Sequence, residues 1–221
     1  MGPLATVDLF NKIVLNTKAE KDQEHIRVVV DNNTNIPDRT KAILEKGEDP
    51  VKELVKSAKR LSKMGADFLI MPCNTAHYFH ERVQKKVNIP LLNMLKITLN
   101  ALKEQGVTKA GLLATDGTIQ SGMYKTTFEG SGIELICPED QGQKAVMDMI
   151  YKGVKAGVQD FDTAEVEKAI KDLESKGAQV MILGCTELPL AVKMYNLDCK
   201  AVDPTLELAK AAIKTAGGEI S

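Results

Sequence analysis

The chain has 221 residues, with 29 Lys and Arg against 30 Asp and Glu and a formal net charge of -1. A net charge this small provides no field that would gather nucleic acid or hold the chain to an anionic membrane, so a charged ligand must be bound by a few local residues. The sequence contains no apolar run of about 18 residues and no basic-then-apolar leader, and we expect a cytoplasmic protein. The length suits one large α/β domain or two domains of about 100 residues each.

Short apolar runs alternate with longer amphipathic stretches along the chain. In chain order, strands are predicted at residues 26–30, 68–71, 110–114, 133–136 and 180–183. Helices are predicted at residues 50–64, 75–86, 95–105, 119–128, 143–156, 163–175 and 204–215. Alternation of strands and helices predicts an α/β fold in which parallel sheets are covered on both faces.

The cysteines are few and widely spread: Cys73, Cys137, Cys185 and Cys199. A chain of this length with so few cysteines is not a disulfide scaffold, and we expect free thiols. No CxxC pair, HExxH helix or histidine-rich cluster occurs, so we expect no metal site.

An internal repeat is the most informative feature of the sequence. LSKMGADFLIMPC, residues 61–73, and LESKGAQVMILGC, residues 173–185, share Leu, Gly, Ala, Ile and Cys at the same offset. Each copy has the pattern of a helix end, a Gly turn, a buried strand and then a cysteine. The helix–Gly–Ala–strand pattern is common in α/β proteins, whereas a cysteine at the end of both copies is harder to attribute to chance.

Half of the chain is about the size of a minimal doubly wound unit, so the repeat predicts two pseudo-symmetric doubly wound domains. We expect a first lobe of residues 1–94, joined by the C-terminal helix at 206–221, and a second lobe of residues 95–205. Open parallel sheets bind ligands beyond the carboxyl ends of their strands, where both cysteines of the repeat lie. The predicted active site is therefore the cleft between the lobes.

The two repeat cysteines are each followed by residues that favour a helix start, in CNTAH after Cys73 and CTELP after Cys185. A helix N-terminus beside each sulfur lowers a cysteine pKa from about 8.5 toward neutrality. Two symmetric thiols suit racemisation, in which one thiolate takes the α proton while the opposite thiol gives one. The alternative is a small buried hydrophobe, which we expect for Cys137 and Cys199.

The polar loop at residues 31–40, DNNTNIPDRT, follows a predicted strand and has the composition of a ligand-binding loop. The guanidinium of Arg39 suits a carboxylate through two parallel hydrogen bonds. The alternative for Arg39, Lys155 and Glu187 is an ordinary surface charge. The alternative for His77 is a helix residue with a local hydrogen bond.

Five motifs, in order along nearly the whole chain, resemble the aspartate/glutamate racemase family: MGPLAT (1–6), IPDRT (36–40), MPCNTAH (71–77), LLATDGT (112–118) and LGCTELPL (183–190). The paired PCNTAH and GCTEL motifs are specific rather than generic. The resemblance implies a PLP-independent racemase of two α/β domains that uses no cofactor and forms a homodimer.

The same resemblance implies the site residues. Cys73 and Cys185 are the implied acid/base pair, assisted by Asp38 and Glu187. Arg39 and Lys155 are the implied ligands of the substrate's side-chain carboxylate. The α-carboxylate would be held by the backbone of Met1 and Gly2 and by hydrogen bonds from Asn74, Thr75, Thr118 and Thr186.

Two cations at the site favour a small acidic amino acid, and aspartate is the expected substrate. Glutamate or a broader substrate range is the nearest alternative, because one methylene changes discrimination by only about 1–3 kcal/mol. A cysteine-dependent isomerase or decarboxylase is a second alternative, and there one thiol suffices. A third is an amino-acid-binding relative that does not turn over.

One departure from the family pattern concerns the N-terminus. Family members begin with an apolar strand that runs into GGMGP, whereas this sequence starts at MGP, as if about nine residues of a central first strand were absent. We expect the absence of this strand to leave a cavity in the first sheet. We also expect the natural protein to start further upstream.

Overall fold

A computed structural model describes residues 2–221, and the chain divides into two compact units. The first unit comprises Met1–Ile97 with Thr205–Ser221, and the second comprises Thr98–Pro204. The two α/β lobes expected at 1–94 with 206–221 and at 95–205 stay a prediction. The α/β class with a parallel sheet is confirmed.

The second unit contains a parallel sheet of four strands in the order β2-β1-β3-β4. Its strands are β1 (Lys109–Leu113), β2 (Glu134–Ile136), β3 (Met181–Leu183) and β4 (Ala201–Val202). The first three coincide with predicted strands. The register pairs Leu113 with Leu183, so β1 and β3 end side by side. Because the chain passes from β1 outward to β2 and then back to β3, the strand order reverses between β1 and β3.

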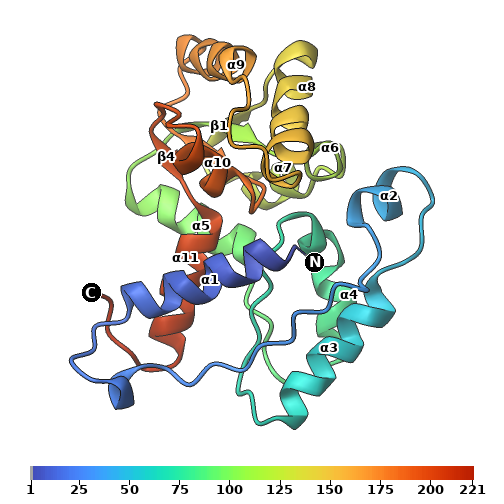
Figure 1. Cartoon of the computed structure of the whole chain (residues 1–221), viewed down its shortest axis with the longest axis vertical. Helices are drawn as coiled ribbons and strands as arrows, with labels where there is room; N and C mark the ends of the chain where they lie inside the picture. The colour runs from blue at the N-terminus through green and yellow to red at the C-terminus, as the bar shows by residue number, and fades with distance from the viewer. Residues whose placement is uncertain (1) are drawn as a thin grey trace. The chain divides into compact units, whose positions relative to one another are not determined.

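Helices alternate with these strands and cover the sheet. They are α5 (Met94–Glu104), α6 (Asp116–Gln120), α7 (Met123–Phe128), α8 (Asp140–Asp148), η3 (Met149–Val154), α9 (Ala164–Ser175) and α10 (Leu188–Met194). α8 and α9 lie side by side, and their buried Val146 and Ile170 share a core with Leu113 and Leu183 of the sheet (Figure 1). The predicted helix at 143–156 is thus an α-helix that continues as a π-helix.

The first unit is mostly helical. Its elements are α1 (Pro3–Asn16), η1 (Asp22–Glu24), α2 (Arg39–Leu44), α3 (Val51–Lys63), η2 (Thr75–Phe79), α4 (His80–Gln84) and α11 (Pro204–Thr215). α1 packs against α11, with Leu9 and Ile13 in contact with a cluster that contains Leu208 and Ile213 (Figure 1). The C-terminal helix therefore belongs to the core of this unit.

The segments 26–30 and 68–71 do not form hydrogen-bonded strands, so the prediction of strands there is wrong. In the described part of the first unit, one isolated parallel bridge joins Leu69 to Leu91, and no backbone hydrogen bond joins 26–30 to another segment. A strand needs a neighbour at about 4.7–4.9 Å to satisfy its backbone donors and acceptors, and apolar composition alone does not supply one.

Cavities border both of these predicted strands. Val28 and Val29 line two cavities of about 110 and 620 Å³ together with Leu69 and Ile70. Val28 and Val29 thus share cavities with Leu69 and Ile70, and no ladder of hydrogen bonds joins the two predicted strands within the described residues.

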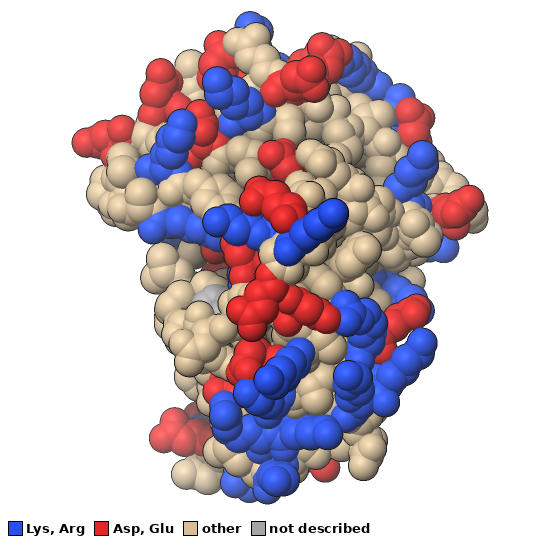
Figure 2. Space-filling view, turned by 90° about the vertical axis from the view of Figure 1, so that its right-hand side faces the viewer, with Lys and Arg blue, Asp and Glu red and all other residues tan. Residues whose placement is uncertain are grey.

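Charges of both signs are mixed on the face shown in Figure 2, and Lys and Arg gather over α3 and α4. Several of these cations are paired: Lys56 with Glu53, Arg60 with Asp31 and Arg82 with Asp49. The pairing offsets part of the local positive charge. None of the helices within residues 2–221 is both long and apolar enough to cross a membrane.

His77 is a buried bridge between two segments of the first unit. Its Nδ1 lies 2.8 Å from the carbonyl oxygen of Cys73, and its Nε2 accepts the backbone N–H of Met94 at 3.1 Å. Since that N–H can only donate, Nε2 is unprotonated and Nδ1 carries the proton. Burial lowers the pKa of His77 to about 4, because a charged ring would lose its water, and nearby His80 adds to the effect. The local hydrogen bond considered for His77 is confirmed.

We expect the free energy of unfolding to fall as the pH drops from 6.5 to 4. The unfolded chain protonates His77 at its ordinary pKa of 6.5 and the folded chain only at about 4, so the folded state binds fewer protons in this window. The loss due to His77 is about 3 kcal/mol. Urea unfolding at a series of pH values measures it, and His77→Gln should flatten the curve. His25→Gln, a histidine of another segment, is the control; equal slopes for wild type and His77→Gln would contradict the assignment.

An apolar strand fused ahead of Met1 should stabilise the first unit by filling the cavities. Each buried apolar side chain contributes about 1.5–3 kcal/mol and ordering each residue costs about 1–2 kcal/mol, so each buried apolar residue should give a net gain on the order of 0.5–1 kcal/mol, and we expect the Tm to rise. A Gly-Ser segment of the same length is the control. If calorimetry gives the same Tm for both fusions, the cavities do not accept a strand.

Candidate active site

The loop after β3 starts where β3 approaches β1 most closely. Gly184 donates its N–H to the carbonyl of Leu113 at 2.7 Å, and a Cβ on Gly184 would lie 2.8 Å from Leu112 Cδ1 and 3.0 Å from the Leu113 carbonyl oxygen. Glycine is the residue that permits this approach without a shift of the backbone. Cys185 follows at the point where the strand order reverses, which is where open parallel sheets bind their ligands.

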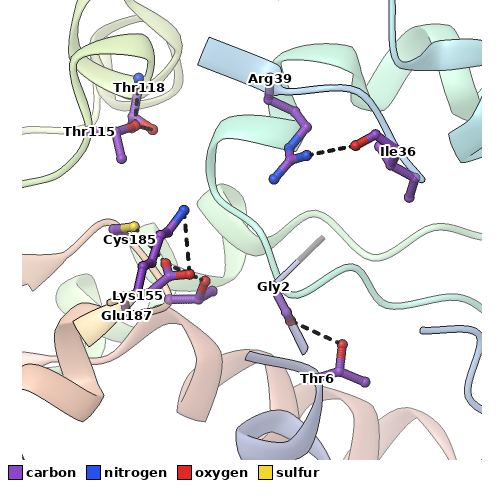
Figure 3. A network of polar contacts seen from close by, with 10 residues as sticks. Gly2, Thr6, Ile36, Arg39, Thr115, Thr118, Lys155, Cys185 and Glu187 are labelled. Atoms are coloured by element: carbon purple, nitrogen blue, oxygen red, sulfur yellow. Dashed lines mark hydrogen bonds and ion pairs between the residues drawn. The ribbon is translucent and has the colours of Figure 1, made fainter. Parts of the chain in front are cut away.

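Cys185, Glu187 and Lys155 form a contact chain, which Figure 3 shows converging on the Glu187 carboxylate. The Cys185 thiol donates to Glu187 Oε2 at 3.0 Å, and the Thr186 hydroxyl donates to the same oxygen at 3.2 Å. Lys155 Nζ lies 3.7 Å from Glu187 Oε1. Glu187 is only 6% exposed, and a carboxylate so buried is stable when it is paired and hydrogen-bonded. Both of its oxygens have such partners.

The thiol of Cys185 is not activated in the way that we predicted. Burial raises its pKa well above the usual value, and Glu187 raises it further by its charge and by accepting the S–H, while Lys155 lowers it. α10 begins only at Leu188, with Glu187 at its N-terminal cap, so a carboxylate lies next to the sulfur. The expectation of a pKa lowered toward neutrality is wrong for Cys185, whose surroundings raise its pKa.

Buried hydroxyl groups follow the neighbouring strand β1. Thr115 Oγ1 accepts the N–H of Thr118 at 3.3 Å, and the two hydroxyl oxygens are 3.1 Å apart. Thr118 is fully buried. Because β1 and β3 end in register, these hydroxyl groups and Cys185 lie at the same edge of the sheet. This edge therefore combines a thiol with the kind of neutral donors that bind a carboxylate.

Lys155 follows a π-helical turn, η3. The last hydrogen bond of this turn runs from the Lys155 N–H to the Ile150 carbonyl at 3.0 Å, a span of five residues. Within the turn, a Cβ on Gly153 would lie 2.8 Å from the Tyr195 hydroxyl. Tyr195 caps α10, so this close approach holds η3 beside the helix that follows Glu187.

Cys73 is half-buried and precedes η2, a tight 3-10 turn. The N–H of His77 donates to the Asn74 carbonyl at 2.8 Å, and the α-helix predicted from residue 75 starts only with α4 at His80. The predicted α-helix N-terminus beside Cys73 is therefore wrong. Asn74 and Thr75 are both buried at this turn.

Arg39 and Asp38 start α2 and have different surroundings. Arg39 donates from one terminal nitrogen to the carbonyls of Ile36 and Pro37 at 3.2 and 2.9 Å (Figure 3). Its buried Nε has no hydrogen-bond partner among the described residues. Asp38 is exposed, and its carboxylate accepts the N–H of Lys41 at 2.8 Å as the cap of α2. Arg39 thus has a buried donor without a partner among the described residues, whereas Asp38 stabilises a helix start; the substrate-binding role implied for Arg39 stays a prediction.

Gly2 is the N-cap of α1, and its carbonyl accepts the N–H and the hydroxyl of Thr6 at 3.3 and 3.4 Å (Figure 3). Met1 lies outside the described residues. The anion-binding role implied for this backbone stays a prediction.

Among the predicted site residues, the structure brings Cys185, Thr186, Glu187 and Lys155 into direct contact. Sequence reasoning missed Tyr151, whose ring centre lies 4.5 Å from Lys155 Nζ. The spacing of four residues within a predicted helix is the signal that would have found this pair. Within residues 2–221, no three His, Cys, Asp or Glu side chains are grouped so as to hold a metal ion.

Comparison with known proteins gives a consistent result. The chain is 30% identical to the broad specificity amino-acid racemase RacX of Bacillus subtilis, over 74% of this chain and 71% of that protein. It is 29% identical to a glutamate racemase of Aquifex pyrophilus over 67% of this chain, but it spans only 58% of that protein.

Among solved structures, the Picrophilus torridus aspartate racemase matches with a TM-score of 0.83 and 34% identity, over 100% of this chain and 92% of that one. A family description for Asp/Glu/Hydantoin racemase matches residues 1–214. With nearly its whole length matched, the chain belongs to the Asp/Glu/hydantoin racemase family.

Proposed function

We propose that the protein is a cofactor-independent racemase that interconverts L- and D-aspartate, with Cys73 and Cys185 as the acid/base pair. The observation that carries the proposal is the contact chain of Cys185, Glu187 and Lys155 at the edge where parallel sheets bind ligands. A cysteine with a purely packing role has no need of a buried carboxylate at 3.0 Å from its sulfur. Family membership supports the reaction type.

The proposed reaction moves one proton onto Cα and one proton off it. The α proton passes to the thiolate of one cysteine, so that an S–H bond forms as the Cα–H bond breaks, and the electron pair is delocalised into the α-carboxylate. The thiol of the other cysteine then donates its proton to the opposite face of Cα and becomes a thiolate. The roles reverse for the other enantiomer.

Burial and Glu187 raise the pKa of Cys185 and so favour its thiol form, and we propose that Cys185 starts as the acid of this pair. To act as the base it must first lose its proton, and Glu187 Oε2 is the nearest acceptor at 3.0 Å. The positive charge of Lys155 favours the resulting thiolate. Glu187 and Lys155 thus work as a proton acceptor and a charge that stabilises the ionised sulfur.

Two groups favour an acidic substrate. The buried Nε of Arg39 and the ammonium of Lys155 are cationic donors suited to a second carboxylate. Thr118, Thr186 and Asn74 are buried donors for the enediolate, each contributing on the order of 2.7–4 kcal/mol. The likeness to a broad specificity amino-acid racemase favours a wider substrate range as the second candidate. A homodimer remains the expectation that the family resemblance implies, and a cytoplasmic location remains the expectation from the sequence.

Loss of either cysteine should abolish racemisation. Cys73→Ser and Cys185→Ser should each reduce the rate by at least about 100-fold, because each removes one of two proton-transfer groups. Deuterium incorporation at Cα of L-aspartate in D₂O, followed by NMR and chiral chromatography, measures exchange and inversion together. Cys137→Ser and Cys199→Ser are the matched controls and should retain activity.

The other outcomes separate the alternatives. Dependence on a single cysteine indicates a one-thiol isomerase or decarboxylase. Exchange with glutamate or neutral amino acids at comparable rates indicates a broad racemase. Binding of aspartate without exchange by a folded protein would refute the catalytic proposal and leave an amino-acid-binding relative.

Glu187→Gln should make the Cys185 thiol easier to ionise. The carboxylate is a named cause of the raised pKa of Cys185, while Lys155 acts in the opposite direction and stays in place. Iodoacetamide modification of the Cys185 peptide, followed by mass spectrometry across pH 7 to 10, should therefore move to lower pH in the variant. Glu165→Gln, an exposed change in the same unit, is the control. A shift to higher pH would mean that Glu187 activates the thiol instead of suppressing its ionisation.

A further inference from the structure

The ring of Tyr151 faces the ammonium of Lys155. Lys155 Nζ lies 4.5 Å from the centre of the ring, within the range of about 6 Å in which a cation is attracted to an aromatic face. The two residues are four apart: Tyr151 lies within the π turn, and Lys155 directly follows it. Tyr151 is 37% exposed and the Lys155 side chain 35%, so each is anchored on one side and reaches solvent on the other.

A lysine side chain holds one position only when it has contacts on more than one side, because it has four rotatable bonds. Lys155 has the Tyr151 ring on one side and Glu187 Oε1 at 3.7 Å on another. Lys152, in the same turn, shows the contrast: it is 71% exposed and pairs with Asp148 at 2.8 Å. A lysine in or next to η3 therefore does not direct its ammonium toward Glu187 by its backbone position alone.

The turn that carries Tyr151 is itself fixed. Gly153 approaches the Phe161 ring, which a Cβ would meet at 3.2 Å, and the Tyr195 hydroxyl donates to the Val158 carbonyl at 2.7 Å. These contacts fasten η3 and the residues after it to the end of α10. The ring of Tyr151 thus starts from a backbone that is held in place.

We infer that Tyr151 is a positioning residue: its ring holds the Lys155 ammonium against Glu187, where the charge acts on the Cys185 thiol and on an acidic substrate. The inference rests on the proposed function for the substrate part and on geometry alone for the placement of Lys155. Tyr151 touches Lys155 and acts through it.

Steady-state kinetics with aspartate test the substrate part. Tyr151→Leu removes the ring, and we expect KM to rise about two- to five-fold with a smaller change in kcat, the size that an exposed cation–ring contact provides. Tyr151→Phe keeps the ring face and should restore the wild-type KM. Lys152→Gln, which removes a neighbouring cation, should leave both constants unchanged. A merely structural role would lower the active fraction, and so kcat, with KM unchanged, and that result overturns the inference.

A crystal structure of Tyr151→Leu tests the placement independently of any activity. We expect Lys155 Nζ to lie beyond 4 Å from Glu187 in Tyr151→Leu and to keep its place in Tyr151→Phe. Nζ still within 4 Å of Glu187 in Tyr151→Leu overturns the inference, whatever the kinetics. If the wild type turns over no acidic amino acid, the proposed function fails, and the crystal structures still decide the role of Tyr151.

Discussion

The buried carboxylate of Glu187 is the group on which the arrangement of the second unit's site depends. Removing an ionised carboxylate from water costs several kcal/mol unless partners replace the water, so each oxygen must be satisfied. One oxygen accepts from Cys185 and Thr186, and the other faces Lys155. Those partners come from two segments, and close packing brings both into place: Gly184 lets β3 approach β1, and Gly153 lets η3 approach the end of α10. The same charge then sets the protonation of the cysteine, so stability and chemistry are coupled through one side chain.

The relative size of two electrostatic effects explains why the pKa of the Cys185 thiol is raised. A helix N-terminus carries about half a positive charge and its influence falls off within one turn, and α10 is only 7 residues long. Glu187 carries a full negative charge 3.0 Å from the sulfur, in a buried site where water screens little. The carboxylate and the burial therefore outweigh the helix, and Lys155 reduces the effect without reversing its direction. A cap-forming sequence after a cysteine predicts activation only when the cap itself is uncharged.

Much of the fold follows from local patterns, and the exceptions have identifiable causes. The apolar runs of β1 and β3 are typical of strands buried on both faces, and with the partly exposed edge strand β2 they form the sheet as predicted. The π turn at η3 was not predictable, since its buried residues, Met149, Ile150, Gly153 and Val154, keep the spacing of an α-helix. α1 was missed because apolar side chains such as Leu4 and Val7 are exposed while Leu9 and Ile13 are buried, which leaves no single stripe. The strands expected at 26–30 and 68–71 failed because a ladder depends on a neighbour that local sequence does not encode. The site residues came from motifs, but the contact between Lys155 and Glu187, 32 residues apart, required the fold.

The two cysteines are equivalent in the internal repeat but not in their surroundings. Cys185 is tied to a buried carboxylate, whereas Cys73 precedes a 3-10 turn whose neutral His77 bonds to its carbonyl. In the proposed reaction, L- and D-aspartate have equal free energies in water, so the equilibrium constant is one and kcat/KM must be the same in both directions. The unequal surroundings of the two thiols can therefore appear only in the separate values of kcat and KM for each enantiomer and in their pH dependence. Different surroundings of the two cysteines are thus compatible with an equilibrium constant of one. Their effect is confined to how kcat/KM divides into kcat and KM for each enantiomer.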